Sequence, residues 1–585
     1  MQVTPLDYGV LVFYFCFLAS IGWITRRFVH NTSDYFRGGG QMLWWMAGAS
    51  AFMNMFSAWT FTGGASRAYT DGTNILWIYL GNAVGFFACA LYFAPKMRQL
   101  RVITPMEAVR QRFGPANEQF FTWISLPTSV IYAGLWLNGL AVFLHAVFGF
   151  DLKLTIIVTG LIVVFNSTIG GSWAVVSSDF MQTLILMLIA LTAAIYSLVS
   201  VGGIGEIVRE FPTESWAFGN GINYPLLAVL WIFLMFFKQF TATNGVLEAP
   251  KYLYAKDSRH ARWAAWFAGA LMLVGPVIWF IPPMVARIQH PDLAAMFPSL
   301  KDPSEAAFVV MALKTLPSGM IGLLIAGMFA ATISSTDSGL NRNAGIFVRN
   351  FYRPILRPNA SEGEQLIAGK LATLGFGGVI ILSGLFLNNL KDLSLFDLMQ
   401  QFSALVSVPV TIPLILMVFV RRTPDWSAWS TVVLGLVISW FSRFVFPGAW
   451  WNATFDLSLS AREVNDWDAV QGLVLGATIL PMWFLFTRRF YREPTGQRKV
   501  DEEIYWENLA TPVHSGDETA KMDGRQGAVL GGLAGAYGLF VLLLALVPNP
   551  IAGRLAFVGF GCALIGLGAL LYRAYNRGNS RESRE

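Results

Sequence analysis

The sequence predicts an all-α polytopic membrane protein, and three properties agree on this. Only 13% of its 585 residues are charged, whereas about a quarter of a soluble protein is charged. Mean hydropathy is +0.53, and 55% of the residues are hydrophobic. The 21 Trp and 47 Phe residues suit the aromatic belts at the two membrane interfaces.

About fifteen apolar segments are near or above the ~20 residues with which a helix crosses the bilayer core. They are residues 7–25, 43–66, 75–94, 118–147, 153–170, 176–201, 223–246, 263–285, 318–349, 367–388, 396–420, 428–446, 467–487, 526–547 and 552–572.

Basic residues predict how these spans are oriented. Residues 7–25 precede Arg26-Arg27, and a signal peptide would carry its charges first, so this is a retained helix with its N-terminus outside. Alternate threading then places the basic loops and the basic C-terminal tail in the cytoplasm. We therefore expect a multi-pass protein of the plasma or inner membrane, with the lipid bilayer as a partner. The net charge of +6 reflects this orientation and not nucleic-acid binding.

Several chemistries are disfavoured by the motifs. The three cysteines lack metal-ligand spacing. No HExxH, GxSxG, Walker A or strand-following GxGxxG pattern occurs, and the five histidines are scattered. We expect neither an enzyme nor a pump that hydrolyses ATP within this chain.

Residues 322–352 combine an apolar stretch with a polar cluster at membrane depth. The cluster is Ser334, Ser335, Thr336, Asp337 and Ser338. Such groups are costly in hydrocarbon unless they are paired or face a cavity. Hydroxyl, carbonyl and carboxylate oxygens are ligands for a hard cation such as Na⁺. The alternative is that the hydroxyls bond carbonyls one turn back on their own helix.

Two further segments have unusual compositions. Residues 43–66 are glycine-rich and polar midway, which predicts a broken helix of the kind that lines ion and solute sites in transporters. Residues 490–525 have mixed charge and predict a partly disordered cytoplasmic tether.

Three phrases carry a family resemblance. Residues 95–114 read PKMRQLRVITPMEAVRQRFG, residues 168–182 read TIGGSWAVVSSDFMQ, and residues 317–341 read PSGMIGLLIAGMFAATISSTDSGLN. Together and in this order they resemble the sodium:solute symporter family, which includes sodium/glucose and sodium/proline cotransporters. The resemblance extends over roughly residues 7–487.

The resemblance implies a LeuT-like core of two inverted five-helix repeats, each with a broken first helix. One N-terminal helix and about four C-terminal helices would be added to it. The expected parts are an extra helix and link (1–42), the first repeat (43–201), the second repeat (202–420), extra helices (421–489), the linker (490–525) and a helical pair with a basic tail (526–585).

The family's principal sodium site maps onto five positions. Carbonyls of Met53 and Phe56 at the first helix break would bind Na⁺ together with the Ala331 carbonyl. The hydroxyls of Ser334 and Ser335 would complete the site.

Some family members hold a second sodium, and its positions match Asp179, Asp337 and Ser338. Asp337 stands where serine is commoner, so it could strengthen a second cation site or carry a proton instead. Asp179 could alternatively be a helix N-terminal acid.

The positions that match the solute site are Thr60, Tyr79, Asn82, Lys238 and Gln400. An ammonium in mid-span must pair or serve a function. Lys238 therefore favours a sugar acid or another carboxylate as the solute. If Lys238 is instead paired with a core acid, or snorkels to the membrane interface, the solute would be a neutral sugar.

Together these observations predict a sodium-coupled secondary symporter that imports a small polar organic solute by alternating access. The alternatives are a sensor or channel built on a transporter fold, or a proton-coupled symporter. Na⁺ is the expected coupling ion, as one or two ions, and the oligomeric state is left open.

Overall fold

The protein is described by a computed structural model that covers residues 4–213, 223–298, 300, 302–387, 403–517 and 525–582. The first helices are α1 (Pro5–Thr25), α2 (Thr32–Arg37), α3 (Trp44–Met55), α4 (Gly63–Asp71), α5 (Leu76–Ala88), α6 (Ala94–Gln99), α7 (Pro105–Phe113), α8 (Pro115–Phe148), α9 (Leu152–Val201) and α10 (Ile204–Glu210). The central helices are α12 (Pro225–Asn244), α13 (Pro250–Leu253), α14 (Ser258–Trp279), α15 (Ile281–Gln289), α16 (Ala307–Thr315), α17 (Met320–Ile346) and α18 (Glu362–Leu387). The last are α20 (Val408–Leu416), α21 (Ser427–Trp440), α22 (Gly448–Phe455), α23 (Ala461–Phe486), α24 (Gln497–Ala510), α25 (Gln526–Leu544) and α26 (Ile551–Glu582).

By length and composition, twelve helical segments among the described residues could cross a membrane. The count of about fifteen is not confirmed, and the difference arises at three places. The expected span 43–66 is divided into the short helices α3 and α4. The expected spans 153–170 and 176–201 are two arms of α9, which meet at a kink at Gly171 (φ 52°). A Cβ there would lie 2.5 Å from the Tyr35 carbonyl oxygen, so the kink requires glycine. The expected span 396–420 lies partly outside the described residues.

The first expected break is present between α3 and α4. The helix ends at Met55, and Phe56 and Ser57 have extended backbone (φ −103° and −142°) before the helix resumes at Gly63. The last carbonyls of a helix lack an intrahelical donor. The break therefore presents carbonyl oxygens inside the protein.

The second expected break follows α12. Asn244 ends the helix, Gly245 is extended (φ −68°, ψ 147°), and α13 begins at Pro250. A Cβ on Gly245 would lie 2.5 Å from the Thr411 methyl group of α20, so the close approach of these two helices requires glycine here.

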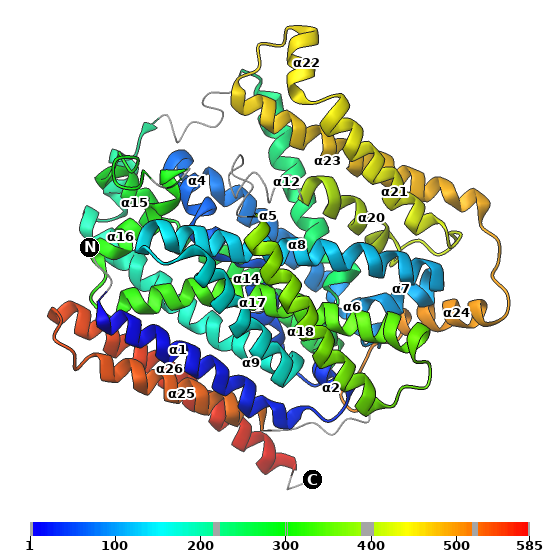
Figure 1. Cartoon of the computed structure of the whole chain (residues 1–585), viewed down its shortest axis with the longest axis horizontal. Helices are drawn as coiled ribbons and strands as arrows, with labels where there is room; N and C mark the ends of the chain where they lie inside the picture. The colour runs from blue at the N-terminus through cyan, green and yellow to red at the C-terminus, as the bar shows by residue number, and fades with distance from the viewer. Residues whose placement is uncertain are drawn as a thin grey trace.

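Helix α17 is at the centre of the molecule, with α9 and α18 beside it (Figure 1). Every residue in its most apolar window is buried inside the protein. It packs against α1, α3, α8, α9 and α18. Because this window is buried, its polar side chains must be satisfied by protein groups or by molecules bound within the protein.

The helical pair α25 and α26 lies along α1 at one edge of the molecule (Figure 1). Glycines let the pair approach closely: a Cβ on Gly531 would lie 2.6 Å from the Gly568 carbonyl oxygen. Phe540 of α25 stacks on Phe13 of α1 with 3.5 Å between ring centroids. The pair therefore joins the core through α1.

The prediction of a disordered tether is wrong for residues 497–510, which form α24. The guanidinium of Arg112 on α7 is fully buried, 3.1 Å from Glu502 of α24. Its Nη2 donates to the carbonyl of Val420 and the hydroxyl of Thr423, each at 2.8 Å. These long-range contacts fold a polar segment that has little apolar area of its own.

Glu502→Ala is expected to lower the stability of the whole protein. It removes the only carboxylate that the described residues place against the buried guanidinium of Arg112. The loss of a charge-assisted bond predicts a free energy of unfolding reduced by about 1.5–3 kcal/mol. Thermal unfolding in detergent measures the effect, with exposed Glu503→Ala as the matched control. Equal midpoints for the two variants would show that α24 contributes nothing to stability.

Candidate functional site

The hydroxyl of Ser335 on α17 lies against the first helix break. Its Oγ is 3.0 Å from the carbonyl oxygen of Phe56, 3.4 Å from that of Met53 and 3.3 Å from that of Ala331. All four residues are buried. Their oxygens converge from two helices and are of the kind that a small hard cation prefers. The donor set therefore fits Na⁺.

The neighbouring hydroxyl contacts a carboxylate instead. Ser334 Oγ donates to Asp179 Oδ1, and Ser50 of α3 donates to Asp179 Oδ2 at 2.5 Å. Asp179 is fully buried on the second arm of α9. The alternative of a helix N-terminal acid is wrong, because the carboxylate joins side chains of two other helices. It links the broken helix to α17 directly beside the candidate sodium site.

Asp337 faces a different neighbour from Asp179. Its carboxylate accepts from Asn166 Nδ2 at 2.8 Å and from Ser167 Oγ at 2.7 Å, both on the first arm of α9. Ser338 is half-buried, and its hydroxyl makes no hydrogen bond within the described ranges. The structure thus gives the three predicted second-site residues separate surroundings, and a second cation site stays a prediction.

The alternative, in which the hydroxyls of the cluster bond carbonyls one turn back on their own helix, holds for one member. Thr336 Oγ1 donates to the Thr332 carbonyl one turn back, at 2.8 Å. Ser334 and Ser335, by contrast, reach other helices. The cluster therefore contains one ordinary helix hydroxyl beside two that join separate elements.

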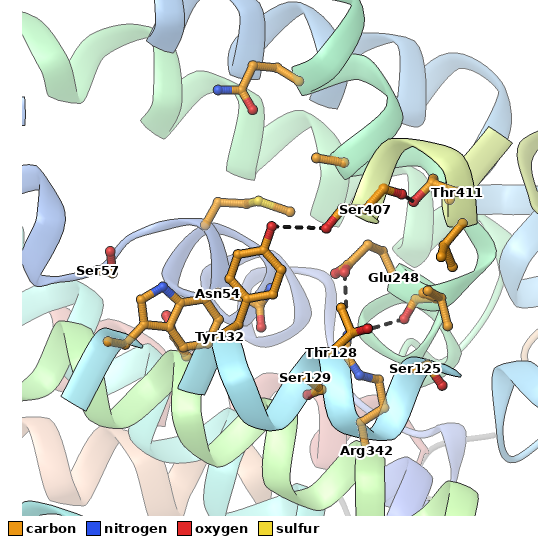
Figure 2. A pocket seen from close by; sticks show the side chains of 18 of the residues that line it. Asn54, Ser57, Ser125, Thr128, Ser129, Tyr132, Glu248, Arg342, Ser407 and Thr411 are labelled. Carbon is orange, nitrogen blue, oxygen red and sulfur yellow. Dashed lines mark hydrogen bonds and ion pairs between the residues drawn. The ribbon is translucent and has the colours of Figure 1, made fainter. Parts of the chain in front are cut away.

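A cavity of about 300 Å³ adjoins the candidate sodium site, because Ser335 is part of its wall. Figure 2 shows Asn54 at the end of α3 and Ser57 of the first break on one side, and Ser407 and Thr411 on another. The wall combines hydroxyls, amides and aromatic rings with three charged groups. Its charged members among the described residues are Lys238, Glu248 and Arg342.

Comparison with known proteins identifies the family. A model of the sodium:solute symporter family matches residues 35–435. The chain belongs to this family. The recognition from three sequence phrases is thereby confirmed, and with it sodium-coupled symport.

Individual symporters are similar over most of the chain. The sodium/myo-inositol cotransporter 2 of Sus scrofa is 30% identical over 475 residues, which are 74% of this chain and 69% of that protein. A sodium/sialic acid symporter of Proteus mirabilis is 26% identical, over 74% of this chain and 88% of that protein. The solved structure of a Na⁺-coupled sialic acid symporter has a TM-score of 0.62 at 21% identity, covering 82% of this chain and 98% of that one. This structural likeness supports the LeuT-like fold.

In this symporter the predicted solute residues divide into three groups. Tyr79, Asn82 and Lys238 line the cavity. Thr60 is not a residue of the cavity wall, but its hydroxyl lies 2.8 Å from the hydroxyl of Tyr79, which is. Gln400 lies outside the described residues.

Aromatic rings are packed together at the wall of the symporter's cavity. Tyr79 packs against Trp279 and Phe280 at centroid distances of 5.7 and 5.2 Å, and Trp59 stacks on it at 6.3 Å. Trp59 and Tyr79 are the members of this group on the wall.

Sequence reasoning missed several wall residues. Tyr132 of α8 lies 2.9 Å from Ser407, and Arg342 of α17 is close to Glu248. Arg342 follows Ser335 by two helical turns of ~3.6 residues, which places both on one face of α17. That spacing was a usable signal. The contact between Tyr132 and Ser407 left no such signal in the sequence, because it depends on the packing of segments that are far apart in the chain.

Asp337→Asn tests whether this carboxylate binds a cation or a proton. If it does, the variant should show a lower Hill coefficient for Na⁺ or a changed pH dependence of transport, because an amide keeps the size but loses the charge. Charge moved per solute, measured in proteoliposomes across pH, provides the readout. Identical values in variant and wild type would make Asp337 a structural residue that ties α17 to α9.

Proposed function

We propose that this symporter imports a small polyhydroxylated solute that bears a carboxylate. The observation that carries the proposal is the charge of the cavity wall. Two of its described charged residues, Lys238 and Arg342, are cationic, and one, Glu248, is anionic. A carboxylate on the solute would meet these cationic side chains through charge-assisted hydrogen bonds.

The rest of the wall suits hydroxyl groups. Asn82 Oδ1 is buried and has no hydrogen-bond donor within the described part of the chain, so a solute hydroxyl could supply one. The hydroxyls of Ser57 and Thr128 also line the cavity. A neutral polyol is the second candidate, favoured by the 30% identity to a sodium/myo-inositol cotransporter.

The structure does not support the alternative that Lys238 is permanently paired with one of the two core acids, Asp179 and Asp337. The described partners of Asp179 are Ser50 and Ser334, and those of Asp337 are Asn166 and Ser167. The lysine instead lies on the cavity wall. This arrangement favours a role toward the solute.

Sodium would act by ordering the first break. Bound at Met53, Phe56, Ala331 and Ser335, with Ser334 beside it, Na⁺ would hold the broken helix against α17. Tyr79 and Asn82 of α5 and Lys238 of α12 would then form the solute site next to it. Such coupling is reciprocal, so solute binding would raise Na⁺ affinity equally. With the N-terminus outside and the C-terminus in the cytoplasm, one charge moving down 100 mV supplies about 2.3 kcal/mol for uptake.

Counterflow in proteoliposomes tests the proposal. Labelled glucuronate and sialic acid serve as carboxylates, and glucose and myo-inositol as neutral probes, each with and without Na⁺. We expect Na⁺-dependent exchange of a carboxylate. Exchange of the neutral probes alone would reject the anionic solute and leave a polyol symporter, whereas Na⁺-independent exchange would reject sodium coupling.

A further inference from the structure

A second set of polar groups lies two turns along α17 from the candidate sodium site. Arg342 and Asn343 of α17 line the cavity there together with Glu248, which lies within the second helix break. Figure 2 shows Arg342 and Glu248 beside Ser125 and Thr128 of α8. None of these five residues is among the positions that the family resemblance assigned to ions or solute.

The guanidinium of Arg342 is only weakly engaged. Its Nη1 is 3.4 Å from both Glu248 Oε1 and the Leu247 carbonyl oxygen, long distances for hydrogen bonds. Nη2 and Nε donate to no group within the described residues. A guanidinium has five donors in a fork that matches a carboxylate. Most of its binding capacity therefore remains open toward the cavity.

Glu248 has a closer partner than Arg342. Lys251 of α13 forms an ion pair with Glu248, and the Lys251 side chain is buried. The carboxylate is thus compensated by Lys251 even when Arg342 moves away. Glu248, Lys251 and Arg342 together carry one net positive charge.

Asn343 supplies an independent indication of a ligand. It is 1% exposed, its side chain is part of the cavity wall, and its Nδ2 has no acceptor in the described part of the structure. Buried donors are rarely left unpaired in proteins, and each exception calls for an explanation. A carboxylate oxygen held by Arg342 would supply the missing acceptor.

We propose that Arg342 and Asn343 form a second carboxylate subsite. The solute carboxylate binds there after it leaves Lys238. In the absence of solute, the carboxylate of Glu248 takes its place beside Arg342. The proposal rests on the proposed function for the identity of the solute. On the way through, the solute carboxylate replaces the long contact of Glu248 with Arg342, while Lys251 retains Glu248. The subsite would select carboxylates over neutral sugars.

Binding to the purified full-length protein in detergent tests this subsite without requiring transport. Isothermal titration compares glucuronate with glucose, which differ only by the carboxylate, and sialic acid with myo-inositol, in chloride-free buffer. In wild type we expect a preference for the carboxylates. Arg342→Gln should reduce that preference at least about tenfold, the size of a charge-assisted hydrogen bond. Affinity for the neutral probes should not change.

Two other variants make the result specific. Asn343→Ala should also weaken carboxylate binding, whereas a purely structural asparagine whose Nδ2 has no partner predicts no loss. Arg349→Gln is the matched control, because Arg349 is on the following segment, paired with Glu107 at 3.0 Å and absent from the cavity wall. It should leave the preference intact.

Several outcomes would overturn the subsite. The first is that wild type shows no preference for the carboxylates. The second is that Arg342→Gln weakens the binding of carboxylate and neutral probes equally. The third is that added chloride changes probe binding in wild type but not in Arg342→Gln, which would indicate a halide site. Failure of the proposed function is distinct: Na⁺-dependent counterflow would be absent while the carboxylate preference and its loss in Arg342→Gln persist.

Discussion

Ser335→Ala is expected to raise the Na⁺ concentration for half-maximal uptake tenfold or more, a loss of at least about 1.4 kcal/mol. The hydroxyl lies 3.0–3.4 Å from three carbonyl oxygens that come from both sides of the candidate site. Alanine removes a ligand for which this buried site has no substitute. Ser334→Ala should have a similar effect, because it also removes a donor to Asp179.

Thr336→Ala is the matched control for both serine variants. It removes a buried hydroxyl of the same helix whose hydrogen bond goes to the Thr332 carbonyl one turn back. The Na⁺ dependence of uptake should therefore stay near wild type in the control. Wild-type Na⁺ dependence in Ser334→Ala and Ser335→Ala, at normal expression, would remove sodium from this position.

Lys238→Gln is expected to weaken solute binding by about 1.5–3 kcal/mol if the solute is a carboxylate. Lys238 is 6% exposed and lies on the cavity wall, so it would meet the solute in a largely dehydrated site. Glutamine retains a hydrogen-bond donor but not the charge. Na⁺ binding in the absence of solute should survive, which separates a role toward the solute from a role in the sodium site.

Lys238→Arg and a neutral probe complete this test. Arginine keeps the positive charge and should recover part of the carboxylate affinity, whereas myo-inositol binding should change little in either variant. If Lys238→Gln instead impairs Na⁺ binding or folding and leaves solute affinity at saturating Na⁺ intact, the lysine has a structural role. A carboxylate solute would then have to depend on Arg342 alone.

The features that could be predicted from sequence are those written locally along the chain. The membrane class follows from composition, and the first helix break follows from polar residues and glycine within one segment, 43–66. The second break was implied by the family resemblance. The polar cluster of α17 is likewise visible because five polar residues are consecutive. The helix count was less secure, because a continuous α9 hides two arms and residues 388–402 are not described.

The tertiary structure decided which partner each polar group meets. Asp179 and Asp337 are both buried carboxylates, but one faces Ser50 and Ser334 while the other faces Asn166 and Ser167. Periodicity gives the face of a helix on which a residue lies, but it does not give the distant helix that packs against that face.

The same reason explains the two contacts that sequence reasoning did not anticipate. Arg112 meets Glu502, and Arg342 meets Glu248, over long distances in sequence. The sequence by itself determined that this chain is a sodium:solute symporter with a hydroxyl-lined core. Only the packing of helices distant in sequence decided where its buried charges lie, because a buried charge depends on partners that local composition does not reveal.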